Sequence, residues 1–342
     1  MKKLEAKYEG KVLGLGEVML RLTPPSYEKI IQANSFSATY AGGEANVICS
    51  LSMFGHDTKF VTKLPDNKLG EKVIKDLRSF GVDTKDIIRG EGRLGIYFLE
   101  QGMGLRNTDV IYDRKYSAIS MAKEDEFDID KILEDVKLLH ISGINPALSD
   151  DLKNTTLKLV KECKKRNIIV SYDSNFRAKL WSLEDARQFM IEILPYVDIA
   201  FLGILDFKNI LLYDIPTESF EENLKILYTK LFEKYPNLKF ASSTRRKVNS
   251  VNNNSLNGYL FDGENVNKSK EYTLDILDRV GGGDSFTAGI LHGLLNQMTC
   301  EETVEFATCA SVLKHSISGD MNLVSKKDVY TLMMSGVENI NR

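Results

Sequence analysis

The chain has 342 residues, of which 43% are hydrophobic and 27% charged, and its formal net charge is −3. This composition is typical of a soluble globular protein, and the acidic balance leaves no overall positive field for nucleic acid. No stretch approaches the roughly 18 apolar residues of a membrane span, and acidic residues precede the first apolar run, which argues against a signal peptide. We therefore expect a cytoplasmic protein without a nucleic-acid or membrane partner.

Short β-rich runs alternate along the chain with longer segments of helical periodicity. The expected strands are 12–16, 59–63, 138–142, 168–173, 198–202 and 239–243. The expected helices are 44–54, 70–80, 150–166, 182–194 and 220–234. Such alternation predicts a mainly parallel sheet covered by helices on both faces, with ligands at the carboxyl ends of the strands. We predict one three-layer α/β/α domain over 1–342.

Two segments, 17–40 and 93–118, break this alternation. The first has little helical pattern, and the second is typical of two strands, 94–100 and 109–116, joined by a glycine-rich turn. A small sheet beside a cleft often acts as a lid that excludes water from the chemistry. It can also be a flap that forms a dimer, and the two roles are compatible. We therefore predict a small β-sheet lid and a homo-oligomer, a dimer through the lid.

An early glycine pair opens the first expected helix, in the segment Ala41-Gly42-Gly43-Glu44-Ala45-Asn46-Val47. Glycines at Gly42 and Gly43 let a small ligand approach the backbone closely. Asn46, one turn into the helix, can bond a hydroxyl group. The plain alternative is a helix start with glycine at the cap.

A late glycine run, Gly281-Gly282-Gly283-Asp284, precedes another segment of helical periodicity. Successive backbone N–H groups of such a loop, with the positive end of the helix, make an anion hole for a transferring phosphoryl group. A carboxylate at that helix start can take a proton from an attacking hydroxyl. The plain alternative is a glycine-rich turn with Asp284 as an ordinary N-cap.

Two other nucleotide motifs are missing from the sequence. There is no Gly-x-x-x-x-Gly-Lys-[Ser/Thr] loop, and Gly14-x-Gly16 lacks the third glycine of a dinucleotide fingerprint. This argues against a Rossmann dehydrogenase, which would share the same class of sheet.

Together the two glycine motifs resemble the ribokinase-like (PfkB) carbohydrate kinases. In that family an early Gly-Gly…Asn segment contacts the sugar, and a late Gly-Ala-Gly-Asp carries the anion hole and the base. The late motif of this chain, 281–284, departs from that pattern by one methyl group, which leaves the backbone donors intact. The resemblance covers most of the chain and implies a ribokinase-like fold, ATP and Mg²⁺.

Within the family the chain is most similar to 2-keto-3-deoxygluconate kinases. The stretches that carry this likeness are 16–22, 110–118, 140–148, 172–181 and 277–284. In those enzymes the arginines that match Arg114 and Arg177 face the sugar-acid substrate and the transferred phosphate. Arginine can hold a carboxylate bidentately, which a neutral sugar does not require. The plain alternatives are a solvated strand residue for Arg114 and a structural ion pair with Asp173 for Arg177.

The resemblance also assigns further contacts. For the substrate it implies Gly42, Gly43, Asn46, Tyr97, Tyr112, Arg114 and Asp320. For ATP it implies Asn175, Ser243, Arg245, Lys247, Gly281 and Gly283. For catalysis it implies Asp284 with Gly281, Gly282, Gly283 and Arg177. The two tyrosines have the alternative of half-buried strand aromatics.

Two departures from the family affect the nucleotide side. Many members have an Asn-x-x-Glu motif tied to magnesium, whereas here Asp206 is the only acid near that point, so the residues that organise the metal stay unknown. A Thr-x-Gly loop is replaced by 242–247, whose three consecutive cations meet phosphate oxygens or form a solvated turn. The asparagines 252–254 are typical of a hairpin tip.

The resulting prediction is ATP-dependent phosphorylation of the terminal (C6) hydroxyl of 2-keto-3-deoxygluconate, giving the 6-phosphate and ADP, with Asp284 as general base. One alternative is a related sugar kinase of the same family, of the fructokinase or ribokinase type. Another is a nucleotide- or sugar-binding regulator without catalysis. The choice between gluconate- and galactonate-derived substrates stays open.

Overall fold

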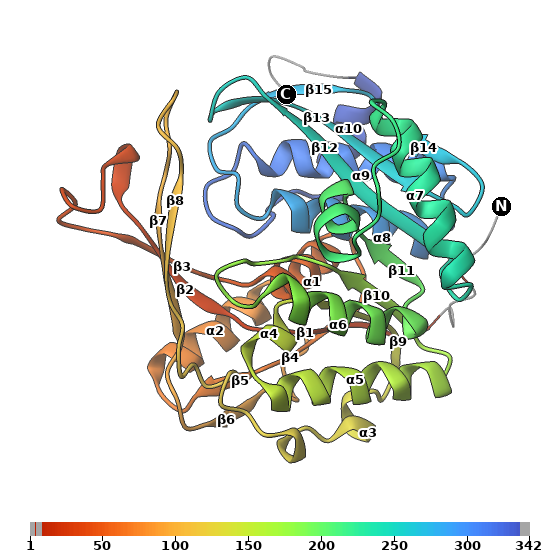
Figure 1. Cartoon of the computed structure of the whole chain (residues 1–342). Helices are drawn as coiled ribbons and strands as arrows, with labels where there is room; N and C mark the ends of the chain where they lie inside the picture. The colour runs from red at the N-terminus through yellow and green to blue at the C-terminus, as the bar shows by residue number, and fades with distance from the viewer. Residues whose placement is uncertain (1–3, 5–8, 336–342) are drawn as a thin grey trace.

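A nine-stranded β-sheet forms the centre of the computed structural model, which describes residue 4 and residues 9–335 (Figure 1). Its strands are β1 (Lys11–Leu15), β4 (Thr58–Val61), β9 (Val136–Ser142), β10 (Ile169–Asp173), β11 (Ile199–Phe201), β12 (Phe240–Val248), β13 (Asn253–Phe261), β14 (Val266–Lys268) and β15 (Tyr272–Asp275). From β4 through β1, β9, β10 and β11 to β12 all neighbours are parallel. β13 then joins antiparallel and carries β14 and β15.

Helices cover both faces of this sheet. They are α1 (Gly43–Met53), α2 (Lys68–Ser79), α3 (Ile129–Ile132), α4 (Asn145–Leu148), α5 (Asp150–Lys165), α6 (Leu183–Ile193), α7 (Phe220–Lys234), α8 (Gly282–Leu295), α9 (Cys300–Lys314) and α10 (Lys326–Ser335). One apolar core joins α5, α6 and α7 to the sheet, and a second joins it to α1, α8 and α9. In Figure 1 the first group lies in front of the sheet. The predicted three-layer α/β/α class is confirmed.

The sequence pattern explains both cores. In β9, Leu139 and Ile141 pack into one core while Leu138 packs into the other, because successive side chains of a strand point to opposite faces. The five expected helices are all present, with ends within two residues of the predicted ones. The expected strand 59–63 ends earlier, at Val61, and Lys63 begins a separate short strand, β5 (Lys63–Pro65), which pairs with β6 (Ile88–Gly90).

A separate four-stranded sheet stands beside the main one, at the left of Figure 1. Its order is β3 (Ser37–Ala41), β2 (Met19–Thr23), β7 (Gly95–Glu100) and β8 (Asp109–Asp113). We call this sheet the lid. Register places Arg21, Tyr97 and Tyr112 side by side across it, so these three side chains share one face of the lid.

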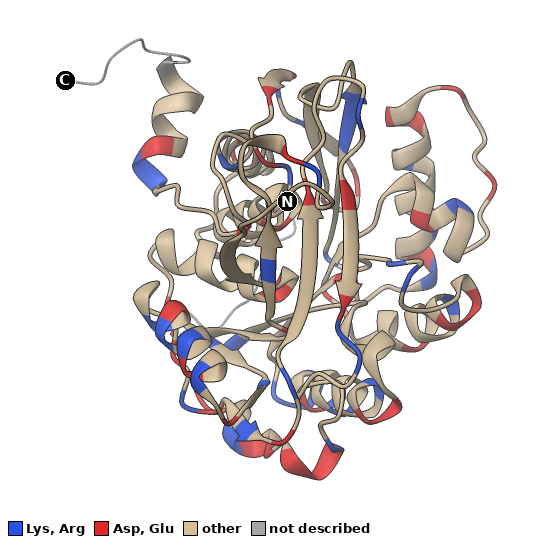
Figure 2. Cartoon of the chain, turned by 90° about the vertical axis from the view of Figure 1, so that its left-hand side faces the viewer, with Lys and Arg blue, Asp and Glu red and all other residues tan. Residues whose placement is uncertain are grey.

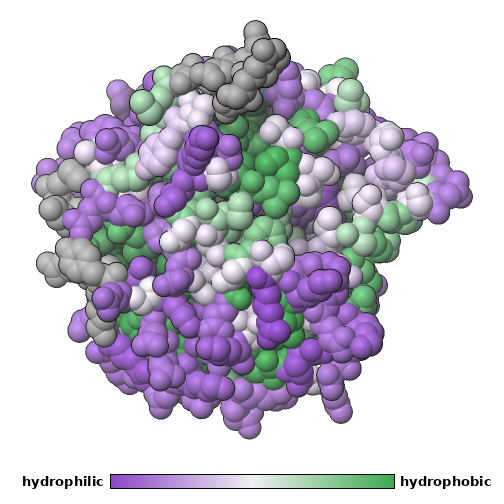
Figure 3. Space-filling view, turned by 180° about the vertical axis from the view of Figure 1, so that it is seen from behind, coloured by the Kyte–Doolittle hydropathy of each residue, from purple (hydrophilic) through white to green (hydrophobic). Residues whose placement is uncertain are grey.

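The surface is unevenly charged. In Figure 2, where the lid faces the viewer, the lid strands carry few charged residues, whereas Lys, Arg, Asp and Glu crowd the helices below. Figure 3 shows the opposite side from that of Figure 1, with a hydrophilic lower half and a band of more hydrophobic residues running up the middle.

None of the helices in the described part of the chain is both long and apolar enough to cross a membrane.

The start of α8 depends on two glycines that cannot carry a side chain. Gly281, the N-cap, has a φ of +84°, a left-handed conformation that favours glycine. A Cβ atom on Gly282 would lie 2.3 Å from Cε1 of the buried His315. The imidazole is fixed there by a 2.7 Å bond from its Nδ1 to the carbonyl of Ser311. His315 therefore occupies the space that the alanine of the family motif would need.

We expect Gly282→Ala to lower the free energy of unfolding by about 1–3 kcal/mol, because a methyl group is forced into the buried imidazole. The double variant with His315→Ala should recover part of that loss, and a four-way comparison by chemical denaturation measures the coupling. Gly283→Ala is the matched control, since no atom outside the local backbone lies within 4 Å of its Cβ position. Equal losses in both glycine variants would contradict this explanation.

Candidate active site

Two cavities meet at the carboxyl ends of the main strands in the described part of the chain. The first, about 580 Å³, lies along β12 and is called the β12 cavity. The second, about 460 Å³, lies under the lid and is called the lid cavity. Asp173, Asn175 and Gly283 line both of them. A group bound in one cavity is therefore adjacent to a group bound in the other.

Asp284 lines the lid cavity next to Gly283, which lines both cavities, and it lies in the first turn of α8 rather than at its N-cap. Asn46 of α1 donates a 2.6 Å hydrogen bond from Nδ2 to its carboxylate. Burial raises the pKa of Asp284 to about 6, although the bond from Asn46 and the charge of Arg177 lower it. Most of this carboxylate is therefore ionised at neutral pH and has the proton affinity of a useful base.

The early glycine pair approaches Asp284 from α1. A Cβ on Gly43 would lie 3.3 Å from the side-chain nitrogen of Asn175 and 3.9 Å from Asp284. Gly42 and Gly43 also line the lid cavity, as does Asn46. The structure thus brings together the two glycine motifs, which are more than two hundred residues apart in the sequence.

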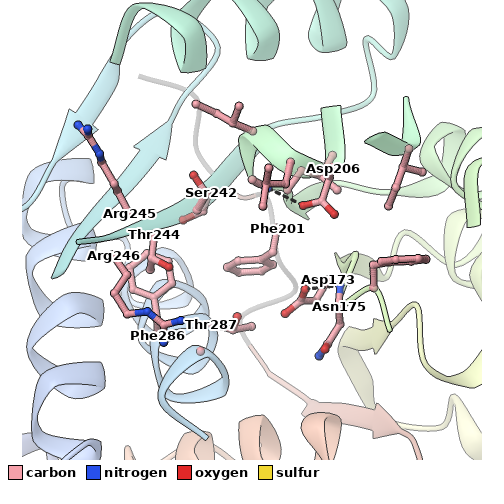
Figure 4. Close-up of a pocket in the computed structure, with 18 of the residues that line it drawn as sticks. Asp173, Asn175, Phe201, Asp206, Ser242, Thr244, Arg245, Arg246, Phe286 and Thr287 are labelled. Atoms are coloured by element: carbon pink, nitrogen blue, oxygen red, sulfur yellow. Dashed lines mark hydrogen bonds between the residues drawn. The ribbon is translucent and has the colours of Figure 1, made fainter. Parts of the chain in front are cut away.

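Two further carboxylates line the β12 cavity, Asp173 at the end of β10 and Asp206 after β11 (Figure 4). Burial, and then the charges of Asp284 and Asp206, raise the pKa of Asp173 to about 7. Burial also raises the pKa of Asp206, although its carboxylate accepts 2.7 Å bonds from the Ser174 hydroxyl and the Gly203 amide. Repulsion among these half-buried acids favours binding of a cation or a proton here.

On the lid side, a buried network holds residues that were predicted to touch substrate. Tyr97 donates from its hydroxyl to Asp320, and Arg21 donates to Asp320 and to Asp278. Only 2% of Arg21 is exposed. Asp320 lines the lid cavity, but its carboxylate is already engaged by these two side chains.

Arg114 is buried and not the solvated strand residue that was the alternative. It lines the lid cavity and forms an ion pair with Glu17. Its guanidinium carbon lies 5.5 Å from the centre of the Tyr112 ring. Its Nε has no partner among the described residues, and neither has Oε1 of Glu17. Much of the positive charge of Arg114 is therefore neutralised before any ligand binds.

Arg177 also lines the lid cavity, but it makes no ion pair with Asp173 or any other described acid. Its Nη1 donates to the carbonyl of Phe176 at 3.2 Å and to that of Asn175 at 3.4 Å. Because carbonyl groups are neutral, these bonds leave the positive charge of the Arg177 guanidinium available for an anionic ligand. The alternative of a structural ion pair with Asp173 is therefore wrong.

The segment 242–247 is neither a loop nor a turn, because β12 continues to Val248. The hairpin tip is accordingly 249–252, and Asn253 and Asn254 already belong to β13. Ser243 and Arg245 line the β12 cavity, whereas Lys247 lies farther along the strand, outside it.

In Figure 4 the side chains of Arg245 and Arg246, both on β12, point in different directions. The Arg245 side chain points away from the other labelled residues, toward Phe220, whose ring centre is 4.8 Å from its guanidinium. Arg246 runs beside Phe286, with its guanidinium near Thr287. Arg246, which the sequence did not single out, is thus the cation of β12 that lies toward the start of α8.

Three further residues near the cavities were not predicted as site residues from the sequence: Glu17, Arg21 and Asp173. Asp173 had a usable signal, since it ends an expected strand at the edge where ligands bind. Arg21 and Glu17 lie in the stretch 16–22 that resembles the family, but only the folded lid brings them to Asp278, Asp320 and Arg114.

Comparison with known proteins places this site in a family. The model of the pfkB family carbohydrate kinases matches residues 10–227 and 258–326. A 2-dehydro-3-deoxygalactonokinase from Haloferax volcanii is 30% identical over 97% of this chain and 99% of that protein. A 2-dehydro-3-deoxygluconokinase from Bacillus subtilis is 24% identical, covering 96% of each chain.

The crystal structure of a 2-dehydro-3-deoxygluconokinase from Thermotoga maritima is 39% identical, with a TM-score of 0.92 over 95% of this chain and 99% of the other. The ribokinase-like fold implied by the sequence is thereby confirmed. The matched model spans both glycine motifs and the strands that bring them together, and the chain therefore belongs to the pfkB family of carbohydrate kinases.

Proposed function

We propose that this sugar kinase transfers the γ-phosphoryl group of ATP to the terminal C6 hydroxyl of 2-keto-3-deoxygluconate, giving the 6-phosphate and ADP. The observation that carries the proposal is the position of Asp284, a half-buried carboxylate with a raised pKa that lies in the lid cavity next to its junction with the β12 cavity. The names of relatives that act on 2-dehydro-3-deoxy sugar acids support the choice of substrate.

Asp284 acts as the general base in this proposal. Its carboxylate takes the proton of the C6 hydroxyl while the oxygen forms a bond to the γ-phosphorus, and the bond from that phosphorus to the bridging oxygen of ADP breaks. Asn46 holds Asp284 in place through the 2.6 Å bond. The backbone amides of 281–283 at the start of α8 and the guanidinium of Arg177 stabilise the charge on the transferring group.

The lid cavity receives the sugar acid. Gly42, Gly43 and Asn46 line the side nearest α1 and hold hydroxyl groups. Arg114 and Tyr112 lie on the lid side and hold the acid end. We assign Tyr97 and Asp320 to the same cavity, with Asp320 fixing the Tyr97 hydroxyl.

The β12 cavity receives ATP, between Asn175 at its edge and Ser243 and Arg245 on β12. Asp173 and Asp206 fit the Mg²⁺ that accompanies ATP, because two half-buried carboxylates with raised pKa values lie in that cavity. In the described part of the chain no three His, Cys, Asp or Glu residues form a complete metal site, which suits an ion that takes other ligands from water and phosphate. The bound ion would neutralise phosphate oxygens.

A kinase for a neutral sugar of the same family is the second candidate. The observation that favours it is the ion pair of Arg114 with Glu17, which leaves less positive charge for a substrate carboxylate. The two candidates differ in whether Arg114 discriminates acid from neutral sugar. The choice between the gluconate- and galactonate-derived acids is a further question, since relatives carry both names.

We expect Asp284→Asn to reduce kcat by roughly 10²–10⁴-fold, because the variant cannot accept the hydroxyl proton. ATP affinity should stay within a few-fold of that of the unchanged protein, since the loop amides remain. Coupled ADP-release kinetics and calorimetric ATP binding measure the two quantities. Normal turnover in the variant would contradict the assignment of the base.

The pH profile of the unchanged protein checks the same assignment. Because burial raises the pKa of Asp284 to about 6, kcat/KM should fall below that pH as the carboxylate is protonated and level off above it. A profile that stays flat down to pH 5 would argue for another base.

Arg114→Leu should raise KM for 2-keto-3-deoxygluconate by at least about tenfold, because a charged hydrogen bond to the carboxylate is lost. Turnover of a neutral sugar such as fructose should change much less. Lys115→Leu is the matched control, since it removes a cation from an exposed neighbouring position. An unchanged KM for the acid would favour the neutral-sugar candidate.

We further propose that two copies of the chain associate through their lids. The row Leu22, Phe98 and Ile111 crosses the lid on the face opposite Arg21, Tyr97 and Tyr112, and Ile111 is 49% exposed. Phe36 adds an edge contact to Phe98 at 5.9 Å between ring centres. A second lid would cover this apolar face.

Light scattering at micromolar concentration should give the mass of a dimer for the unchanged protein and that of a monomer for Ile111→Asp, since a buried carboxylate opposes association. Leu212→Asp, which changes an exposed leucine outside the lid, should leave the dimer intact. A monomeric unchanged protein would exclude the lid contact.

A further inference from the structure

Two arginines beside the glycine loop have no acidic partner among the described residues. Arg279 directly precedes Val280 and Gly281, and Arg246 lies on β12. Neither forms an ion pair with a described Asp or Glu, although Arg21 and Arg114 nearby each do. Arg279 is half-buried and Arg246 is exposed, and a half-buried arginine without a counter-ion is typical of a site that binds an anion.

Arg279 reaches the loop from the lid side. It lines the lid cavity together with Gly281, Gly283 and Asp284. Its Nη2 donates a 3.0 Å hydrogen bond to the carbonyl of Val251, while its Nε is buried without a partner. The single bond to a neutral carbonyl orients the guanidinium but does not neutralise it.

Arg246 reaches the same loop from the nucleotide side. It lines the β12 cavity with Gly283, Phe286 and Thr287, and Figure 4 shows its guanidinium beside the latter two. Burial, and then the positive charge of Arg279, lower the pKa of Arg246. The two guanidinium groups are thus close enough to repel each other across the start of α8.

Among the described residues, the acids next to the loop form no ion pair with these two arginines. Asp278, next to Arg279, is bonded to Arg21, and so is Asp320. Lys314, buried next to Gly281, adds a further basic group, whose Nζ donates a 3.0 Å bond to the carbonyl of Ile317 and forms no ion pair with an acid of the described residues. Positive groups and glycine amides therefore surround the start of α8, an arrangement that favours a ligand with several negative charges.

We propose that Arg246 and Arg279 clamp the polyphosphate chain of a nucleoside triphosphate from the two sides of the Gly281–Gly283 loop. This inference rests on the proposed phosphoryl transfer. Arg279, which shares a cavity with Asp284, contacts the terminal phosphoryl group. Arg246, in the β12 cavity, contacts the phosphates nearer the nucleoside. A single carboxylate would neutralise only one of the two cations, which is why a polyphosphate suits the pair better than the sugar acid does.

Calorimetric titration of the full chain with ATP, ADP and AMP, without sugar, tests the clamp. Arg279→Gln should weaken ATP binding by at least about tenfold, because a charged hydrogen bond is lost, while ADP binding weakens less and AMP binding is unchanged. Arg246→Gln should weaken both ATP and ADP. The unchanged AMP affinity also establishes that each variant is folded.

Arg187→Gln is the matched control, because that arginine lies on α6 and pairs with Glu184, and its nucleotide affinities should equal those of the unchanged protein. Arg279→Lys should restore part of the ATP affinity, since it retains the charge without the planar fork. Equal weakening of ATP and AMP, or an Arg279→Gln variant that raises only the KM of the sugar acid, would overturn the clamp and leave the proposed kinase reaction standing. An unchanged protein that binds no ATP would overturn both.

Discussion

The buried guanidinium of Arg21 connects parts of the chain that the topology keeps apart. It belongs to β2 in the lid, and its two partners, Asp278 and Asp320, lie on either side of α8 and α9 in the sequence. Removing one member of such a network leaves an uncompensated buried charge, which is far more costly than the net stability that the network supplies. The lid is therefore fixed to both ends of the segment that contains the glycine loop, α8 and α9.

The ion pairs of Arg21 also affect which charged side chains next to the glycine loop have a partner. Asp278 and Asp320 share the single guanidinium of Arg21, and among the described residues neither forms an ion pair with Arg279 or Lys314. Their charges nevertheless favour the protonated form of Lys314. On the other side, burial raises the pKa values of Asp173 and Asp284 at the ends of β10 and the start of α8. The start of α8 thus combines carboxylates of raised pKa with cations that form no ion pair among the described residues, which matches a reaction that moves a proton and a phosphoryl group between two ligands.

Much of this arrangement was predictable from sequence, because it depends on local patterns. The alternation of β-rich runs with helical segments indicated a mainly parallel sheet covered on both faces, and the glycines before Asp284 indicated a phosphate loop. The prediction was wrong where long-range geometry decides the outcome. The run 242–247 was expected to be a loop, yet pairing with β13 extends it as a strand. This extension turns Arg246, not Lys247, toward the start of α8.

Gly282, which stands where the family motif has alanine, shows the same limit of prediction from sequence. From sequence, glycine at position 282 is a neutral departure from the family pattern. In the structure the imidazole of His315 fills the space that the methyl would take, so the two positions are mutually constrained. The constraint joins residues more than thirty positions apart and appears only when α9 packs against α8.

The pair of Arg114 and Glu17 bears most directly on substrate choice. An arginine that already has a carboxylate partner can bind a second carboxylate only by sharing its donors, and its Nε is free to do so. A neutral sugar gains nothing from that free donor beyond an ordinary hydrogen bond, whereas an acid gains a charged one, which is about twice as strong. Glu17 therefore weakens the attraction for any anion while leaving the difference between acid and neutral sugar in place. On the proposed function, discrimination between acid and neutral sugar then rests on oriented donors of Arg114, not on excess positive charge, and the free positive charge is left for phosphate.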